Sequence, residues 1–265
     1  SYAARTQTGR VGMSLDTTRS DTPPADRSAQ VRATRVDLAA LHRLGARFGF
    51  DDLVWNHITA RVPGTQHAYL VGRFGLLHSE VTASNLLVVD SAGTIIEGDG
   101  DVNATALVIH TAVHNAQPDA RFVFHSHAPE ALAFCALDCE LEFLQQDAGA
   151  LYDRVGYHEW EGLSLDLAEC DRLATNLGDN KALIMRNHGF LTVGATAGEA
   201  FVNMYYLVRA ASVHLQAAAS GLPRIAQNRD MWEKARDQYE HFAPGVYEWP
   251  ALLRLLDAGE PGYRD

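Results

Sequence analysis

Between positions 31 and 48, hydrophobic residues recur mostly at steps of three or four: Val36, Leu38, Leu41, Leu44 and Phe48. This spacing predicts an amphipathic helix over residues 31–48, because an α-helix makes one turn in about 3.6 residues. The preceding residues, 14–30, are polar and contain prolines, which is typical of a mobile arm. We expect a leader before Met13 and ordered structure from near Val31.

Short apolar or alternating runs follow the first helix, and turn signals such as Pro63-Gly64 and Gly93 separate them. Runs of this kind predict β-strands, in which alternate side chains face opposite sides of a sheet. They lie at residues 53–55, 58–62, 68–71, 86–89 and 94–96. Their close succession predicts a largely antiparallel sheet.

Helix and strand signals alternate in the rest of the chain. Asn103 is placed to cap a helix over residues 104–115, and Thr196 with Glu199 forms the S/T-x-x-E pattern that opens a helix over residues 197–219. Further helices are predicted from Pro129 to about residue 139, over 171–177 and over 231–241, and further strands over 121–127, 182–185 and 190–193. Helices interleaved with strands predict an α/β fold.

The sequence shows no internal repeat and no linker that divides it into separate domains. We therefore predict one domain over residues 31–222, preceded by a leader and flexible arm over residues 1–30. Residues 223–265 are expected to form a C-terminal helix and a tail that packs on the domain or on a neighbouring subunit.

The composition excludes several classes of function. The formal net charge of −11 is spread over the chain without a basic cluster, which argues against nucleic acid as a partner. No apolar stretch approaches the roughly 20 residues of a membrane-spanning helix, so we expect no membrane insertion. The three cysteines form no Cys-x-x-Cys pair and indicate neither a disulfide framework nor a thiolate zinc site, which favours a cytoplasmic location.

Three histidines are candidates for a metal site. His125 and His127 lie two residues apart in a predicted strand, so their side chains point to the same face. His188 lies in a predicted turn between two apolar strands. An isolated His-x-His is more often an ordinary hydrogen-bonded pair, but the third histidine favours a metal ion. Three imidazoles leave coordination positions open, as a catalytic site requires.

Five short motifs, in this order and spacing, resemble the class II aldolase/adducin family from about residue 31 to residue 216. They are NHITAR at 56–61, the loop Phe74-Gly75-Leu76, the helix segment 106–110, His125-Ser126-His127 and Asn187-His188-Gly189. The strings SEVTAS at 79–84 and NHGFLTVG at 187–194 are similar to strings in bacterial members of the family.

The resemblance implies a three-layer α/β/α fold with a mainly antiparallel central sheet. It also implies one divalent metal ion, Zn, Mn or Fe, bound by His125, His127 and His188. Relatives commonly form ring-shaped tetramers in which a neighbouring chain completes each site, so a homotetramer is expected. Tyr247 and Tyr263 are the candidates for that contribution.

The chain departs from the sugar-phosphate aldolases of the family at two places. Those enzymes carry a Ser-Ser-Glu string, whose Glu is the acid/base, where this chain has Ala104-Thr105-Ala106. Their Thr-Gly phosphate loop is replaced by Gly72 to Gly75. Alanine transfers no proton, and the lost hydroxyl groups are suited to phosphate. We therefore expect a small-molecule substrate other than a sugar phosphate.

An aromatic or keto carboxylic acid suits the remaining residues better. The substrate-binding candidates follow one another in the chain: Arg73, Phe74, Gly75 and His78. Arg73 and His78 are possible donors to a carboxylate, whereas Phe122 and Phe124 are expected to face away from the histidines.

The residue that replaces the missing acid/base is left open by the sequence. His110 lies four residues after Ala106 on the same predicted helix, and Tyr247 belongs to the tail. Glu80 and Asp147 are the nearest acidic candidates in the sequence, although Glu80 is equally suited to the start of a helix and Asp147 to a solvated loop.

Three functions are consistent with the sequence. The first is a metal-dependent lyase, either a decarboxylase or a retro-aldolase, that uses the ion as a Lewis acid. The second is a non-heme Fe(II) oxygenase with the same three histidines. The third is a non-catalytic, adducin-like binding module, which the missing Glu favours and the intact histidine set disfavours.

Overall fold

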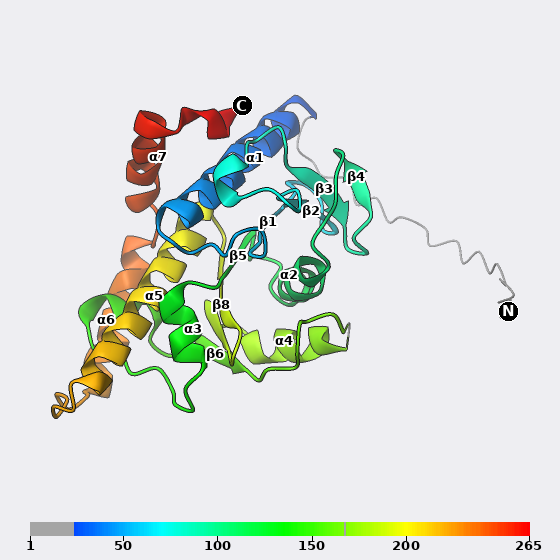
Figure 1. Cartoon of the computed structure of the whole chain (residues 1–265). Helices are drawn as coiled ribbons and strands as arrows, with labels where there is room; N and C mark the ends of the chain where they lie inside the picture. The colour runs from blue at the N-terminus through cyan, green and yellow to red at the C-terminus, as the bar shows by residue number, and fades with distance from the viewer. Residues whose placement is uncertain (1–23, 167) are drawn as a thin grey trace, which may run out of the picture.

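The computed structural model describes residues 24–166 and 168–265, and its centre is one eight-stranded sheet (Figure 1). The strand order is β4-β3-β2-β1-β5-β8-β7-β6, and every neighbouring pair is antiparallel except β6 and β7. The strands are β1 (Ile58–Arg61), β2 (Ala68–Val71), β3 (Leu87–Asp90), β4 (Ile95–Glu97), β5 (Phe122–Ser126), β6 (Val155–His158), β7 (Ala182–Met185) and β8 (Gly189–Gly194). The expected mainly antiparallel sheet is confirmed.

Helices cover both faces of this sheet, which confirms the three-layer α/β/α fold. They are α1 (Pro24–Arg47), α2 (Ala104–Ala116), α3 (Pro129–Cys135), α4 (Glu169–Leu177), α5 (Ala197–Ala219), α6 (Arg229–Phe242) and α7 (Glu248–Gly259). Helices α2 and α4 pack together on one face, and α1, α3, α5 and α7 lie on the other (Figure 1). Three short 3-10 turns, η1 (His78–Glu80), η2 (Gln146–Leu151) and η3 (Pro261–Arg264), join these elements.

Side-chain alternation in β5 decides which of its residues lie on the same face as His125. Phe122 and Phe124 are buried in the core beneath α1 and α5, whereas Val123 joins the smaller core beneath α2 and α4. His125 continues the Val123 side of the strand. The two phenylalanines therefore face away from the histidines, as the sequence predicts.

Helix α1 begins at Pro24, not near Val31, which corrects the predicted start of ordered structure. Proline fits the first turn of a helix because it has no N–H to satisfy there. Residues 26–33 include several good helix formers, and their polar composition had suggested an arm. The rest of the predicted leader and arm lies outside the described residues.

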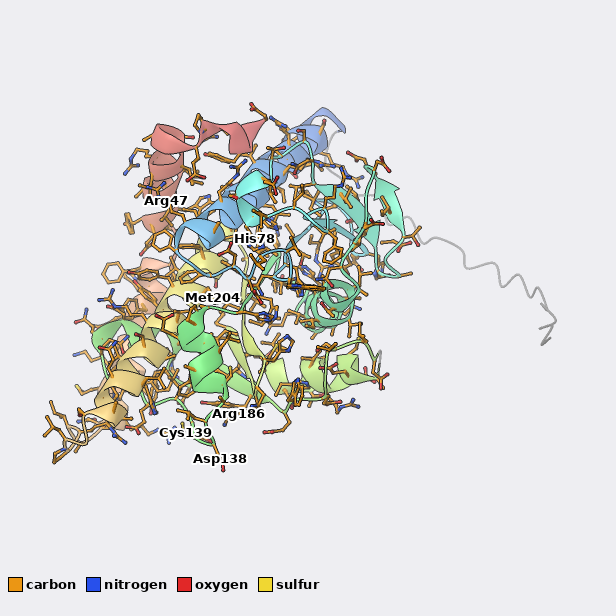
Figure 2. The ribbon with its side chains drawn as sticks, viewed as in Figure 1. Arg47, His78, Asp138, Cys139, Arg186 and Met204 are labelled. Atoms are coloured by element: carbon orange, nitrogen blue, oxygen red, sulfur yellow. The ribbon has the colours of Figure 1, made fainter. Side chains whose placement is uncertain are left out.

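Several shorter elements also differ from the sequence prediction. Residues 53–55 form a turn rather than a strand, and Leu53 has a positive φ of 49°. Helix α3 ends at Cys135, where the following loop is held by Arg186, which donates to the carbonyls of Leu137 and Cys139 at 2.9 and 2.7 Å (Figure 2). Strand β6 was not predicted, because Val-Gly-Tyr-His carries only a weak apolar signal.

The C-terminal tail packs on its own chain. Tyr263 is fully buried and donates from its hydroxyl to Asp257 at 2.9 Å. Its carbonyl accepts from the N–H of Ala83 at 3.0 Å, and Trp249 of α7 donates to Asp37 of α1 at 3.1 Å. None of the helices in the described part of the chain is long and apolar enough to cross a membrane.

Candidate metal centre

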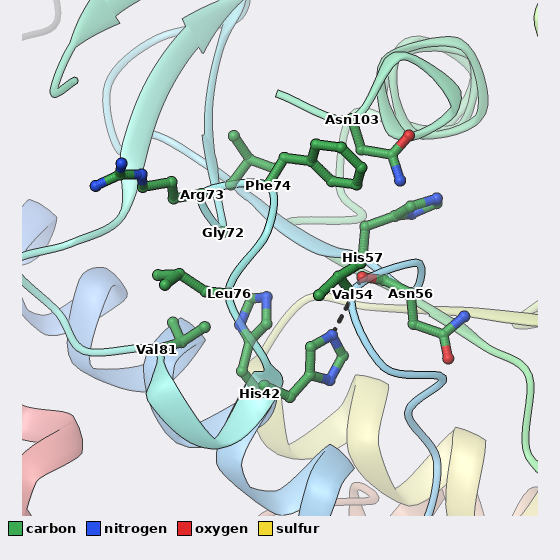
Figure 3. Close-up of a pocket in the computed structure, with 12 residues that line it drawn as sticks. His42, Val54, Asn56, His57, Gly72, Arg73, Phe74, Leu76, Val81 and Asn103 are labelled. Carbon is green, nitrogen blue, oxygen red and sulfur yellow. Dashed lines mark hydrogen bonds between the residues drawn. The ribbon is translucent and has the colours of Figure 1, made fainter. Parts of the chain in front are cut away.

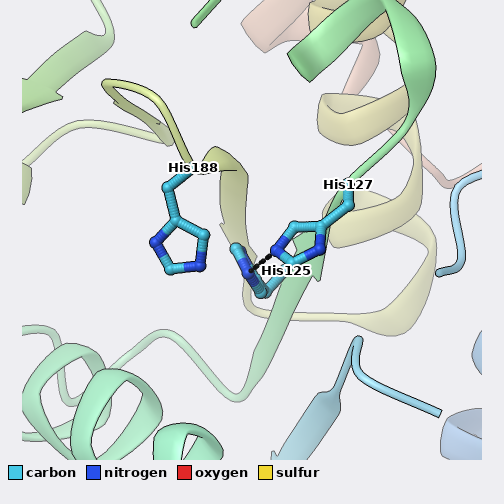
Figure 4. A group of neighbouring side chains, drawn as sticks. All are labelled: His125, His127 and His188. Atoms are coloured by element: carbon cyan, nitrogen blue, oxygen red, sulfur yellow. Dashed lines mark hydrogen bonds between the residues drawn. The ribbon is translucent and has the colours of Figure 1, made fainter. Parts of the chain in front are cut away.

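His125, His127 and His188 converge at the ends of β5 and β7, as Figure 4 shows. Each offers one ring nitrogen, and these three nitrogens lie within 4.8 Å of one another. His125 is the last but one residue of β5, and His127 follows the strand on the same face. His188 occupies the tight β7–β8 turn, in which Asn187 has a φ of 54°. The three predicted ligands are therefore brought together.

The hydrogen bonds of the first two histidines determine where their protons lie. His125 Nδ1 lies 3.0 Å from the carbonyl of Phe190, and His127 Nδ1 lies 3.0 Å from a carboxylate oxygen of Asp52. Both partners accept hydrogen bonds only, so both Nδ1 atoms carry a proton. In the neutral rings, each Nε2 is then a bare lone pair.

These two Nε2 atoms lie only 2.9 Å apart (Figure 4). With both rings neutral, no proton lies between these atoms, and two facing lone pairs repel unless a cation lies beside both. Tetrahedral zinc with bonds near 2.0–2.1 Å would separate two such nitrogens by about 3.3 Å, a few tenths more than observed. The residues present therefore fit a divalent ion.

His188 is suited to complete the set because it is neutral. Burial, with smaller contributions from His127 and His158, lowers the pKa of His188 to about 4. Burial also lowers the pKa of His125 well below 6.5. Neutral imidazole is the form that ligates metals, so these two rings offer lone pairs at neutral pH.

Two further residues support the ligands. Asp52, in the loop before β1, orients His127 through its hydrogen bond to Nδ1. The sequence does not predict this role, because no local pattern links Asp52 to a residue 75 positions away. Asn56 accepts the backbone N–H of His127 on its Oδ1 at 3.2 Å. Its amide nitrogen is buried and has no partner among the described residues, so it remains a donor for a ligand.

A small cavity of about 20 Å³ adjoins this group through Asn56 and His57 (Figure 3). Its volume admits about one water molecule, or one oxygen of a substrate. Arg73, Phe74 and His78 line it, whereas Gly75 is exposed in the turn beside it. The cavity therefore gathers three of the four substrate-binding candidates.

The orientation of the Arg73 side chain differs from the expected role. It passes over Gly100, and its guanidinium points away from His57 (Figure 3). Phe74 instead faces the cavity and contacts Trp55, with ring centroids 5.6 Å apart. The structure thus presents an aromatic pair, and the Asn56 amide rather than Arg73 is the donor that lies within reach of the histidines.

His78 is held as a donor to the backbone rather than as a free group. Its Nε2 lies 3.2 Å from the carbonyl of Asn56, which requires a proton on that nitrogen. Its Nδ1 is buried without a partner among the described residues. Burial lowers the pKa of His78, so the ring is neutral and accepts rather than donates at its second nitrogen.

The catalytic candidates lie in different surroundings. His110 is buried on α2, and its Nε2 contacts His57 at 2.8 Å. Glu80 is exposed and accepts the N–H of Leu77 at 2.8 Å, which caps η1. Tyr247 is 74% exposed at the start of α7, and Asp147 pairs with Arg209 at 3.2 Å. Of these residues, His110 is the one that the structure joins to the histidine group.

The fully buried side chain of Tyr263 corrects one further expectation. Its ring is enclosed by its own chain and its hydroxyl is occupied by Asp257. It is therefore not available to complete the site of a neighbouring subunit.

The chain is similar to proteins of known sequence and structure. The chain is 36% identical over 251 residues to alpha-adducin of Mus musculus. This match covers 87% of this chain and 33% of alpha-adducin. It matches the structure of an aldolase II superfamily protein from Pseudomonas syringae with a TM-score of 0.84 and 36% identity, over 91% of this chain and 99% of that one.

A second structure, of L-fuculose 1-phosphate aldolase from Glaciozyma antarctica PI12, matches with a TM-score of 0.82 and 30% identity. The match covers 92% of this chain and 97% of that one. The family described as Class II Aldolase and Adducin N-terminal domain matches residues 36–215. With the three-layer fold and these relatives, this match shows that the chain belongs to the class II aldolase and adducin family.

Proposed function

We propose that the protein is a divalent-metal-dependent carbon–carbon lyase, a decarboxylase or a retro-aldolase, that acts on a small aromatic or keto carboxylic acid. The observation that carries the proposal is the pair of bare Nε2 atoms on His125 and His127, 2.9 Å apart, with His188 beside them. A Zn, Mn or Fe ion held there would act as a Lewis acid toward a substrate oxygen.

The protein's own groups supply orientation. The carboxylate of Asp52 and the carbonyl of Phe190 fix the two ring orientations, so that both lone pairs point to one place. The free amide of Asn56 lies beside them and is suited to donate to a carboxylate or a developing oxyanion. These contacts are set by buried or half-buried groups before any ligand arrives.

The surroundings support a carboxylic acid rather than a sugar phosphate. Ala106 is buried on α2 where the sugar-phosphate aldolases carry their acid/base. Of the described residues that line the cavity, Arg73 is the only cation, and its guanidinium points away from His57 (Figure 3). The adjacent Phe74 and Trp55 rings favour an aromatic or apolar substrate group.

The first test is the metal content of the purified protein, measured by elemental mass spectrometry. We expect about one divalent ion per chain in the wild type and in His67→Ala, an exposed histidine outside the site. We expect loss of the ion in His125→Ala and His188→Ala. An ion that persists in both of these variants would overturn the proposal.

The second test is turnover of a panel of aromatic hydroxy and keto acids by the metal-loaded protein. Release of carbon dioxide or of an aldehyde without oxygen consumption is the expected result. Turnover that consumes O₂ with iron as the bound metal would instead identify an oxygenase that uses the same histidines.

One observation favours a second candidate, a non-catalytic binding module. The chain lacks the acid/base Glu at position 106 and is similar to alpha-adducin over most of its own length. A protein that binds no metal and turns over none of the panel would support this candidate.

A further inference from the structure

A continuous row of hydrogen bonds leads from the end of α2 to the metal centre. His114 Nδ1 contacts the carbonyl of Ala120 at 3.0 Å, and His114 Nε2 contacts the hydroxyl of Thr59 at 2.9 Å. The same hydroxyl contacts His110 Nδ1 at 2.6 Å, and His110 Nε2 contacts His57 Nδ1 at 2.8 Å. All four side chains are buried.

The carbonyl at one end of the row fixes the first two protons. A carbonyl only accepts, so the proton of His114 lies on Nδ1. Burial lowers the pKa of His114 to about 3, and the neutral ring therefore has a bare Nε2. That nitrogen accepts the hydroxyl proton of Thr59.

The remaining protons follow in order. The Thr59 oxygen has given its proton to His114, so it accepts from His110 Nδ1. Burial lowers the pKa of His110 well below 6.5, which keeps this ring neutral. His110 Nε2 is therefore bare and accepts from His57 Nδ1. The row ends with a lone pair on His57 Nε2.

No protein donor within the described residues satisfies this lone pair well. The nearest hydroxyl, that of Thr105, lies 3.4 Å away, and its single proton is directed to Asn103 Oδ1 at 2.8 Å. His57 Nε2 is therefore a weakly satisfied acceptor, because no other hydrogen-bond donor among the described residues contacts it.

The position of His57 connects this lone pair with the proposed site. Its ring stacks on His125 with centroids 4.9 Å apart, and it lines the cavity shared with Phe74. Positions 106 and 110 lie on one face of α2, four residues apart. The His57 ring reaches from His110, which contacts its Nδ1, to the hydroxyl of Thr105, which lies 3.4 Å from its Nε2. Thr105 is the residue before Ala106.

We propose that His57 Nε2 is a substrate-contacting hydrogen-bond acceptor that selects a ligand with an O–H group beside the atoms bound at the histidine cluster. The substrate class is thereby narrowed to hydroxy acids. His110, Thr59 and His114 are positioning residues that hold the proton of His57 on Nδ1. The inference rests on the proposed function for the class of its ligand. The proton arrangement of His57, His110 and His114 does not require a bound ligand.

Nitrogen chemical shifts from long-range proton–nitrogen NMR of histidine-labelled protein test the arrangement directly, after metal removal with a chelator. We expect His57, His110 and His114 to carry their protons on Nδ1 in the wild type. The hydroxyl-retaining Thr59→Ser should keep this pattern, whereas Thr59→Val should release His57 from it. His42, whose Nδ1 donates to Leu38 in a separate contact, is the internal control.

A proton on Nε2 of His57 in the wild type would overturn the inference, and this result requires no variant to fold. Metal content of the same preparations, measured before the chelator is added, separates the two proposals. Absence of metal with the expected protons contradicts the lyase proposal alone, whereas a metal-binding wild type with the proton on Nε2 contradicts the His57 inference alone.

Binding of mandelate and of its O-methyl ether to the zinc-loaded protein tests the acceptor. The wild type should bind mandelate at least about tenfold more tightly, the factor expected for one hydrogen bond. His57→Phe keeps a ring against His125 but has no acceptor, so it should bind both compounds equally. Equal binding by the wild type would overturn the assigned specificity.

Discussion

Replacing Asp52 by asparagine tests how far the metal centre depends on a carboxylate that does not itself bind the ion. Asp52 accepts from His127 Nδ1 at 3.0 Å, and its side chain is 43% exposed. Asparagine keeps an oxygen that can accept the same hydrogen bond but removes the charge. The substitution therefore isolates the electrostatic support of the ligand.

The expected loss follows from the geometry of this pair. Loss of a partner that orients a metal-binding histidine lowers metal affinity by about 10–100-fold. Water reaches Asp52 and can replace part of the lost interaction, so we expect the lower end of this range. An affinity loss of about tenfold corresponds to about 1.4 kcal/mol.

Zinc titration against a chromogenic chelator at pH 7 and constant salt measures the dissociation constant. Asp51→Asn is the matched control, since it removes the same charge at the neighbouring position, whose side chain has no contact with His127 among the described residues. Equal weakening in the two variants would refute the reasoning, because it would show a general charge effect and no role for the Asp52 contact.

Three other changes test separate parts of the structure. Gly189→Ala should weaken zinc binding in the same titration, because a Cβ there would lie 2.5 Å from the carbonyl oxygen of Ser126 and 2.9 Å from the His127 ring. Unchanged zinc affinity would contradict this packing. The free energy of unfolding of the metal-free protein, measured with urea, should fall as the pH drops from about 6.5 to about 3. Over this range His114 binds a proton in the unfolded chain but not in the folded chain, because burial lowers its pKa to about 3. His114 alone contributes a slope of about 1.4 kcal/mol per pH unit, so His114→Gln should show a shallower dependence, and an equal slope would contradict the assignment. Tyr263→Ala should destabilise the chain by about 3–5 kcal/mol in urea, the usual cost of removing a fully buried aromatic ring, whereas a loss below about 1 kcal/mol would show that the tail does not pack as described.

The sequence was sufficient for those parts of the site that depend on local geometry. Alternation along one strand placed His125 and His127 on one face and both phenylalanines on the other, and the structure agrees. The predicted cap of α5 also forms, with Thr196 accepting the N–H of Glu199 at 3.1 Å. Strand and cap geometry repeats over two to four residues, which is the range that a sequence pattern can report.

The parts that the sequence did not predict depend on long-range packing. Asp52 meets His127 only after β1 and β5 pair, and α7 packs on α1 through residues more than 200 positions apart. Position 57 carried a partial signal, since His57 lies just before β1, two residues from Thr59, and His110 and His114 share one face of α2. The β1 residues and this face of α2 come into contact only in the folded chain, and no local pattern reports that contact.

The histidine row bears on the choice between an enzyme and a binding module. A buried acceptor that loses its donor costs about 1–3 kcal/mol, and the row leaves on His57 a lone pair whose nearest donor, the Thr105 hydroxyl, is 3.4 Å away and directed elsewhere. A module that only binds other proteins gains nothing from this cost, and an apolar side chain at position 57 would remove it. The same ring stacks on His125 and lines the cavity beside the histidine cluster. A weakly satisfied acceptor at that one place is explained by a ligand that arrives with its own donor, and this favours an enzyme over a binding module.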